Sequence, residues 1–294
     1  MTFLSGFIAI LGPPNVGKST LLNRIVGAKL SIVSPKPQTT RNRVLGIHHG
    51  DGFQMIFMDT PGIHKTRTPL HRSMVDSAYS AFQEVDILVL MIDMKDPEAP
   101  EIPSLIGVAK RSEKPALLVI NKIDRGNKSE ILPVIGKFSD EAFFDAIIPV
   151  SALKGDGVPE LLEAIRTKLK PGPPFFPPDM RTDQPDTFMM SEIIREKIYL
   201  FTRHELPYSS AVTVERVEEA AEKNLLRIFA VVHVETLSQK GILVGRQGTM
   251  VKKIGEAARM ELERCFNVQV YLNLTVRVSK NWSRDTRALR RLGY

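Results

Sequence analysis

The sequence is poor in cysteine and in long apolar runs. Its single cysteine, Cys265, cannot form an internal disulfide and has no evident catalytic partner, so we expect it to be a small core residue. The apolar run 87–92 is far too short to span a bilayer, and the N-terminus lacks the basic start and apolar stretch of a signal peptide. With no low-complexity tract, the chain is expected to be a globular cytoplasmic protein. Peripheral contact with the inner membrane is left open.

Charge is unevenly distributed along the 294 residues, which are enough for two domains. Residues 241–294 contain 11 Lys/Arg and 4 Asp/Glu; against chain totals of 40 and 33, this leaves 29 of each sign in the first 240 residues. The net charge of +7 therefore resides in the last part of the chain. Such an excess is typical of a polyanion-binding module, and equally of a helix with a solvated basic face.

A phosphate-loop motif lies near the N-terminus. Gly12-Pro13-Pro14-Asn15-Val16-Gly17-Lys18-Ser19 matches G-x-x-x-x-G-K-[ST] between a predicted strand, 7–11, and a predicted helix, 20–26. The glycines let successive N–H groups point at one anion, Lys18 can reach the β- and γ-phosphates, and Ser19 can bind Mg²⁺. The alternative is a glycine turn before an ordinary helix, but both flanking elements favour a nucleotide site.

Strands and helices alternate as far as residue 169. We predict strands over 44–49, 53–58, 87–92, 116–120 and 146–150, and helices over 70–83, 101–112, 129–138 and 159–169. Gly50-Asp51-Gly52 predicts a hairpin between the first two of these strands. The alternation predicts an α/β domain with a mostly parallel, doubly wound sheet.

Polar segments follow several of these strands, at the sheet edge where nucleotides bind in such folds. They are Asp59-Thr60-Pro61-Gly62, Asn121-Lys122-Ile123-Asp124 and Ser151-Ala152-Leu153-Lys154. A polar loop, 34–41, carries Thr39 and Thr40. The sequence thus predicts one site built from several loops.

A proline-rich stretch, 171–178, marks a domain boundary because proline lacks the backbone donor and fixes φ. We predict a first domain over 1–170, a stiff linker over 171–186 and a second domain over 187–294. Phe175 and Phe176 are expected to dock against one of the domains.

The second domain has a different order of elements. Helices are predicted over 187–204, 238–243 and 249–265, and strands over 208–217, 225–235 and 268–279, giving α-β-β-α-α-β around Gly245-Arg246-Gln247-Gly248. Helical spacing places Val251, Ile254, Ala258 and Leu262 on one face, so that Lys252, Lys253 and Arg259 lie elsewhere on the surface. A short basic helix with Trp282 at its start is predicted over 281–291.

Taken together, the phosphate loop, the Thr39-Thr40 loop, and the DTPG, NKID and SALK segments resemble a GTPase of the translation-factor class. The resemblance implies that Asn121 and Asp124 recognise guanine: the aspartate accepts from N1–H and the 2-amino group, and Lys122 packs over the base. Adenine lacks these donors, which disfavours an ATP-driven RNA remodeller.

The second domain resembles a type II KH domain, the RNA-binding fold whose G-x-x-G loop holds about four nucleotides. GRQG alone could be a glycine-bounded turn between helices. Joined to this GTPase domain, with Gln38-Thr39-Thr40-Arg41 in the first part and GILVGRQG in the second, it closely resembles the bacterial Era family over essentially the whole chain. The resemblance implies a factor in small ribosomal subunit assembly that binds near the 3′ end of 16S rRNA.

The resemblance also implies individual roles in the nucleotide site. Ser19 and Thr40 would bind Mg²⁺ with support from Asp59, Thr39 being the alternative to Thr40, and the Gly62 N–H would contact the γ-phosphate. Residues implied to bind the nucleotide are Gly12 to Thr20, Asp59, Thr60, Pro61, Gly62, Asn121, Lys122, Asp124, Ser151, Ala152 and Leu153. Lys18, Thr40 and Gly62 would be catalytic.

Two positions qualify the hydrolysis reaction. Ile63 replaces the water-orienting glutamine of Ras-like enzymes, which predicts slow intrinsic turnover. Asn15 occupies the position of an asparagine that helps to hold K⁺ in related glutamine-lacking GTPases; a loop-stabilising amide is the equal alternative.

In the second domain, the GRQG residues Gly245, Arg246, Gln247 and Gly248 would meet the sugar-phosphate chain. Ile242, Val244, Ile254 and Val232 are candidates either for base contacts or for the core, and Lys252, Lys253, Lys280 and Arg284 would supply positive charge. The competing hypothesis is a signalling GTPase whose basic second domain binds a protein or an acidic membrane surface.

Overall fold

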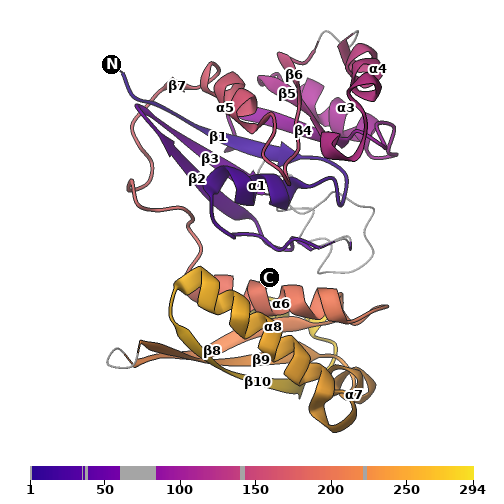
Figure 1. The fold of residues 1–294 in the computed structure, drawn as a ribbon, viewed down its shortest axis with the longest axis vertical. Helices are drawn as coiled ribbons and strands as arrows, with labels where there is room; N and C mark the ends of the chain where they lie inside the picture. The colour runs from indigo at the N-terminus through magenta and orange to yellow at the C-terminus, as the bar shows by residue number, and fades with distance from the viewer. Residues whose placement is uncertain (1, 35, 37–38, 60–83, 140–142, 221–223) are drawn as a thin grey trace. The chain divides into compact units, whose positions relative to one another are not determined.

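The computed structural model describes residues 2–34, 36, 39–59, 84–139, 143–220 and 224–294. These residues form two compact units, shown in Figure 1. The first contains most of the chain as far as Asp183, and the second contains residues 184–294 together with the short segment 34–39. Each unit is described separately below.

The sheet of the first unit has the order β2-β3-β1-β4-β5-β6, with β7 paired to β1. Strands β2 and β3 form the predicted antiparallel hairpin, β7 is antiparallel to β1, and the other pairs are parallel. The predicted mostly parallel sheet is therefore confirmed. Its strands are β1 (Leu4–Leu11), β2 (Val44–Gly50), β3 (Phe53–Asp59), β4 (Ile87–Asp93), β5 (Ala116–Asn121), β6 (Ala146–Pro149) and β7 (Lys170–Pro171).

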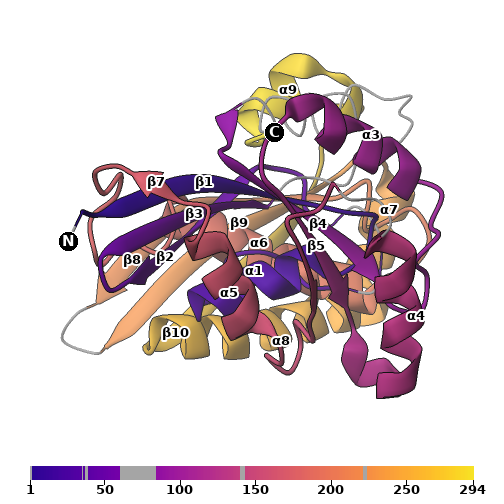
Figure 2. The same cartoon turned by 90° about the horizontal axis from the view of Figure 1, so that it is seen from above.

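Helices cover both faces of this sheet, as Figure 2 shows. On one face, Leu90 and Leu118 share a core with Leu105 and Phe138, whereas Val89 on the other face is equally buried. The helices are α1 (Lys18–Val26), α3 (Ile102–Ser112), η1 (Ile123–Arg125), α4 (Lys128–Ser139) and α5 (Val158–Arg166). The helix predicted over 159–169 ends at residue 166 because the chain turns there to form β7. The helix predicted over 70–83 lies outside the described residues.

The segment 171–183, which we expected to be part of a linker, belongs to the first unit. The buried Gln54 side chain accepts hydrogen bonds from the backbone N–H of Phe175 (2.8 Å) and Phe176 (3.1 Å) and donates to the Phe176 carbonyl (2.8 Å). The Phe175 ring also packs against Phe7, with ring centroids 5.0 Å apart. One amide side chain thus fixes the course of the proline-rich segment on its own domain.

The second unit has the predicted α-β-β-α-α-β order, and its sheet has the order β10-β9-β8. Strand β10 is parallel to β9, and β8 is antiparallel to it. The elements are α6 (Asp186–Phe201), β8 (Ala211–Ala220), β9 (Leu225–Val234), α7 (Leu237–Val244), η3 (Arg246–Gly248), α8 (Thr249–Phe266), β10 (Gln269–Val278), η4 (Trp282–Arg284) and α9 (Thr286–Arg291). Strand β8 starts three residues later than predicted because the N–H groups of Tyr208 and Ser209 both bond to the Glu205 carbonyl in a turn.

The core of this unit lies between the sheet and helices α6, α7 and α8. Ile254, Ala258 and Leu262 are fully buried, as the helical spacing predicted. Cys265, expected in the core, is exposed, because the next residue, Phe266, makes the final apolar contact of α8. Within the described parts of the chain, no helix is both long enough and apolar enough to cross a membrane.

Candidate functional site

The phosphate loop lies between β1 and α1 and depends on its two glycines. Gly17 precedes the first residue of α1 with a φ of 110°, and a Cβ atom there would lie 2.3 Å from Asn121 Nδ2. A Cβ at Gly12 would lie 2.5 Å from the Met91 carbonyl oxygen. Both positions therefore require glycine for close approach. Of the other predicted residues here, Pro13 and Val16 are buried, Pro14 and Thr20 are half-buried, and Asn15 is exposed.

Lys18 occupies the first turn of α1 with its ammonium group buried. Its Nζ donates to the carbonyl oxygens of Gly12 (2.9 Å) and Pro13 (3.0 Å). Burial lowers the pKa of Lys18 to about 8, against the opposing influence of the nearby Asp59 carboxylate. A phosphate group placed over this loop would stabilise the charged form of the lysine, because an adjacent anion raises the pKa of an ammonium group.

Ser19, Thr40 and Asp59 converge from α1, the following loop and the end of β3. The Ser19 hydroxyl donates to Asp59 Oδ2 at 2.6 Å and lies 3.0 Å from the Thr40 hydroxyl, which is 3.3 Å from the same carboxylate oxygen. Of the two threonines considered for this role, Thr40 is the one whose hydroxyl contacts Ser19.

These three residues fit a magnesium ion. Asp59 is fully buried, which raises the pKa of its carboxyl group, and its Oδ1 has no hydrogen-bond partner among the described residues. A buried carboxylate beside two hydroxyl groups is an all-oxygen donor set, which Mg²⁺ prefers. A cation here would also favour the ionised form of Asp59.

Asn121 connects the phosphate loop to the loop after β6. Its Nδ2 donates to the Val16 carbonyl (2.7 Å), and its Oδ1 accepts from the Ala152 N–H (2.9 Å). The side chain is 2% exposed. Both ends of its amide are therefore used inside the protein, which fixes two of the predicted nucleotide-binding loops to the end of β5.

The neighbouring residues complete this edge of the sheet. Lys122 has a left-handed φ of 65°, and its Nζ contacts the Asn15 carbonyl (2.7 Å) and the Asp93 carboxylate (2.7 Å). Asp124 accepts a hydrogen bond from the Ser151 hydroxyl at 2.7 Å. A carboxylate has further acceptor positions, so Asp124 can receive the paired donors of a guanine edge. Thr60, Pro61, Gly62 and Ile63 lie outside the described residues.

The GRQG segment forms the tight turn η3 between α7 and α8. Gly245 and Gly248 have φ values of 75° and 79°, and a Cβ at Gly245 would lie 2.8 Å from the Met250 nitrogen. The side chains of Arg246 and Gln247 between them are exposed. The turn thus presents one cationic and one amide side chain between two glycines, which have no side chain to keep a ligand away from the backbone. This arrangement suits a sugar-phosphate chain.

Apolar and basic residues beside this turn divide between core and surface. Val232 and Ile254 are fully buried and belong to the core, whereas Ile242 is 54% exposed and Val244 is half-buried. Lys253 lies over the Phe201 ring, with Nζ 4.5 Å from the centroid. Lys252, Lys280 and Arg284 are exposed, while Arg259 is paired with Glu263 at 2.8 Å.

Known proteins match both units. The family described as "50S ribosome-binding GTPase" matches residues 7–122, and the family described as "KH domain" matches residues 205–283. The GTPase Era of Syntrophus aciditrophicus (strain SB) is 49% identical over 292 residues, covering 99% of this chain and 95% of that protein. The chain belongs to the Era family. The GTPase Era of Geobacter metallireducens is 48% identical, covering 99% of this chain and 98% of that protein.

Two solved Era structures share the fold over nearly the whole chain. A variant of Aquifex aeolicus Era bound to GDP and aluminium fluoride matches with a TM-score of 0.94 and 40% identity, covering 100% of this chain and 99% of that one. An Era complex with MgGDPNP and nucleotides 1506–1542 of 16S ribosomal RNA matches with the same TM-score and identity, covering 99% of each chain. The order of domains predicted from the Era resemblance is therefore confirmed.

Sequence reasoning missed two residues that support the site in this Era-family chain. Asp93 pairs with Lys122, and its position at the end of β4 is the same signal that identified the other strand-end residues. Arg24 contacts the carbonyl oxygens of Ala152 (3.4 Å) and Leu153 from the last turn of α1. No sequence signal pairs Arg24 with residues so far along the chain.

Proposed function

We propose that this chain is a GTPase that binds Mg²⁺ and acts in the assembly of the small ribosomal subunit, where it binds near the 3′ end of 16S rRNA. Residues 1–170 bind and hydrolyse GTP, residues 187–294 bind RNA, and the stretch 171–186 joins them, with residues 171–183 attached to the first unit. The observation that carries the proposal is the convergence of the phosphate loop, Asn121 and residues 151–152 at one sheet edge. The RNA assignment is supported by the solved Era complex with 16S rRNA.

The residues of the site have distinct tasks in this function. Lys18 and the N–H groups of the loop bind the phosphates and stabilise the charge that develops as the γ-phosphate leaves. Ser19, Thr40 and Asp59 would hold Mg²⁺, which neutralises phosphate charge when bound. Because the hydrocarbon side chain of Ile63 cannot orient water, intrinsic turnover is slow, and backbone groups or a partner position the water.

Guanine selectivity is assigned to Asp124. In Asp124→Asn, an amide N–H₂ meets the guanine donors, so GTP affinity should fall by about tenfold or more and preference should shift toward xanthine nucleotides. Calorimetric titration with GTP, XTP and ATP measures this shift. The control is Asp156→Asn, in the loop between β6 and α5. Equal binding of GTP and ATP by the unaltered protein would contradict the GTPase assignment.

Potassium dependence is assigned to Asn15, whose exposed side chain lies on the phosphate loop. A monovalent cation beside the phosphates would add positive charge where negative charge develops. Phosphate release should therefore be faster in KCl than in NaCl at equal ionic strength, and Asn15→Ala should remove the difference. Identical rates in the two salts would exclude this role.

RNA binding is assigned to the exposed GRQG turn. Replacing Arg246 and Gln247 together by aspartate keeps both glycines but places two carboxylates against the phosphate chain, so RNA binding should fail while folding is retained. Lys252→Ala should instead weaken binding to all RNA sequences similarly, and it should reduce the slope of log affinity against log salt concentration by about 0.7. The assay compares a 16S 3′-end oligonucleotide with an unrelated one. Unchanged affinities in the double variant would make the segment only a turn.

A second candidate is peripheral binding of this cytoplasmic protein to an acidic membrane surface. It is favoured by the exposed Arg287, Arg290 and Arg291 of α9, since basic clusters bind anionic lipid. Flotation with phosphatidylglycerol vesicles, with phosphatidylcholine vesicles as the control, tests it. Equal recovery with both lipids would leave RNA as the ligand of the basic surface.

A further inference from the structure

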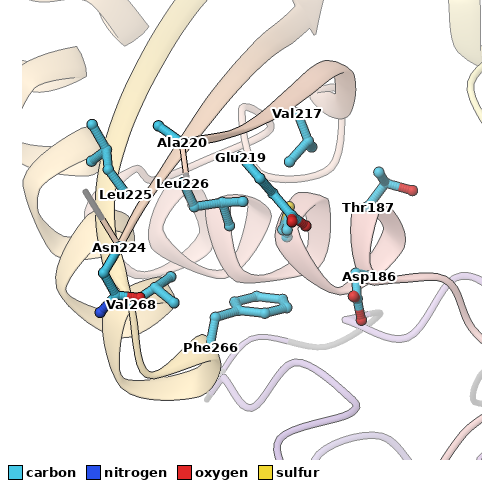
Figure 3. Close-up of a pocket in the computed structure, with 11 residues that line it drawn as sticks. Asp186, Thr187, Val217, Glu219, Ala220, Asn224, Leu225, Leu226, Phe266 and Val268 are labelled. Atoms are coloured by element: carbon cyan, nitrogen blue, oxygen red, sulfur yellow. The ribbon is translucent and has the colours of Figure 1, made fainter. Parts of the chain in front are cut away.

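A pocket of about 450 Å³ lies in the second unit, at the end where α6, β9 and β10 begin and where β8 and α8 finish (Figure 3). Its volume is within the range of about 300–1,000 Å³ typical of ligand sites. Met190 and Leu226 are buried at its floor, and Val217, Phe266 and Val268 provide further apolar surface. The exposed rim carries Asp186, Thr187, Glu219 and Asn224.

The pocket is remote from the GRQG turn. The 18-residue helix α8 runs between them, with Thr249 next to the turn and Phe266 in the pocket wall. At 1.5 Å per residue, this helix separates the two places by about 27 Å. A ligand in the pocket can therefore bind at the same time as a strand of RNA on the turn.

Glu219 departs from the pattern of its strand. It lies opposite Leu226 in the β8–β9 pair, so it is on the same face of the sheet as that buried leucine, where Val217 is also found. Figure 3 shows its carboxylate extending into the hollow beside Leu226. Glu219 is exposed, so water solvates its carboxylate in the free protein, but its negative charge lies beside apolar surface, where it would attract a cation.

Asp186 supplies a second carboxylate from the first turn of α6. Neither Asp186 nor Glu219 forms an ion pair or side-chain hydrogen bond with the described residues, and no described residue of the lining is Lys, Arg or His. Among the described residues, the pocket is thus apolar inside and acidic at its rim. An RNA phosphate is repelled there, whereas a cation next to an apolar group is attracted.

We propose that this pocket is a docking site for a basic peptide segment of a protein partner, in which a large apolar side chain is flanked by Lys or Arg. The apolar side chain packs against Met190, Leu226 and Phe266, and the neighbouring cation pairs with Asp186 and Glu219. Hydrophobic anchoring supplies the contact area, and the two carboxylates select for basic sequence.

The test selects twelve-residue peptides from a random phage library on the full-length protein, with GDP and a 16S 3′-end oligonucleotide present to occupy the other sites. Enriched peptides should carry a large apolar residue beside Lys or Arg. A synthetic copy should shift the methyl resonances of Met190, Leu226 and Val268. Its affinity should fall about tenfold in the isosteric double variant Asp186→Asn with Glu219→Gln.

The matched control is Glu160→Gln with Asp179→Asn, which removes the same charge from exposed positions of the first unit, Glu160 being in the first turn of α5. Peptide affinity should be unchanged in this control. Four results would overturn the proposal: no enriched peptide, enriched peptides without basic residues, equal binding to the double variant, or pocket methyl shifts produced by RNA or by protein concentration alone. The last result would assign the pocket to RNA or to a second copy of the chain.

Discussion

Replacing Asn121 by alanine removes the side chain that joins two nucleotide-binding loops to the end of β5. The change deletes the donor to the Val16 carbonyl and the acceptor of the Ala152 N–H, and it adds no atom that could clash. Val16 and Ala152 are 2% and 1% exposed, so water cannot readily replace either bond.

Each backbone group left buried without a partner costs about 1–3 kcal/mol, so the variant should lose about 2–6 kcal/mol of unfolding free energy. That is a large part of the about 5–15 kcal/mol typical of folded proteins. GDP affinity should fall by about tenfold or more, or about 1.4 kcal/mol, because the phosphate loop and residues 151–152 no longer hold each other in place.

Asn23→Ala is the matched control. The Asn23 amide accepts from the N–H groups of Leu30 (2.8 Å) and Ser31 (2.9 Å) and donates to the Ser31 carbonyl (2.8 Å), so it joins α1 to the loop that follows it and does not link the phosphate loop to residues 151–152. This variant should also lose stability in urea but should keep GDP affinity within about twofold of the unaltered protein. If Asn121→Ala weakens folding yet binds GDP as tightly as Asn23→Ala, the proposed coupling of the two loops is refuted.

Three further predictions follow from single residues. The pKa of Lys18 is about 8 in the free protein, and a bound phosphate should raise it. Calorimetric GDP titrations at pH 8, in buffers of different ionisation enthalpy, should therefore show uptake of about half a proton. Zero uptake would contradict contact between Lys18 and the phosphates. Gly17→Ala should abolish GDP binding through its 2.3 Å clash, whereas Gly27→Ala, with no atom within 4 Å, should only lower stability by about 1 kcal/mol. Burial lowers the pKa of His233, so below pH 6.5 the unfolded chain binds a proton before the folded chain does. The unaltered protein should therefore lose its advantage in unfolding free energy over His233→Gln as the pH falls. Urea unfolding followed by Trp282 fluorescence measures this difference, and a difference that stays constant with pH would contradict the prediction.

Local patterns predicted the elements of the fold well because they depend on near neighbours in sequence. The phosphate loop lies between a strand and a helix as its flanks required, and Gly50-Asp51-Gly52 connects β2 and β3 as a hairpin. Polar segments at strand ends, such as Asn121 and residues 151–152, lie together for the same reason: parallel strands end at one edge of the sheet.

Features formed by residues distant in sequence were not predictable. The Asn121 amide joins Val16 to Ala152, a contact that only the packed sheet reveals. Cys265, which we expected in the core because a lone cysteine usually behaves as a small hydrophobe, is wrongly placed by that argument: it is exposed, and Phe266 takes the apolar position at the end of α8.

The contacts of Gln54 determine how much tether joins the two modules. With residues 171–183 attached to the first unit, the chain between that unit and the start of α6 is reduced to Gln184 and Pro185. A short tether gives one module a high effective concentration around any assembly that the other has already bound. Gln54→Ala would release a longer, flexible connector, so avidity for a bipartite target would fall although neither binding surface had changed.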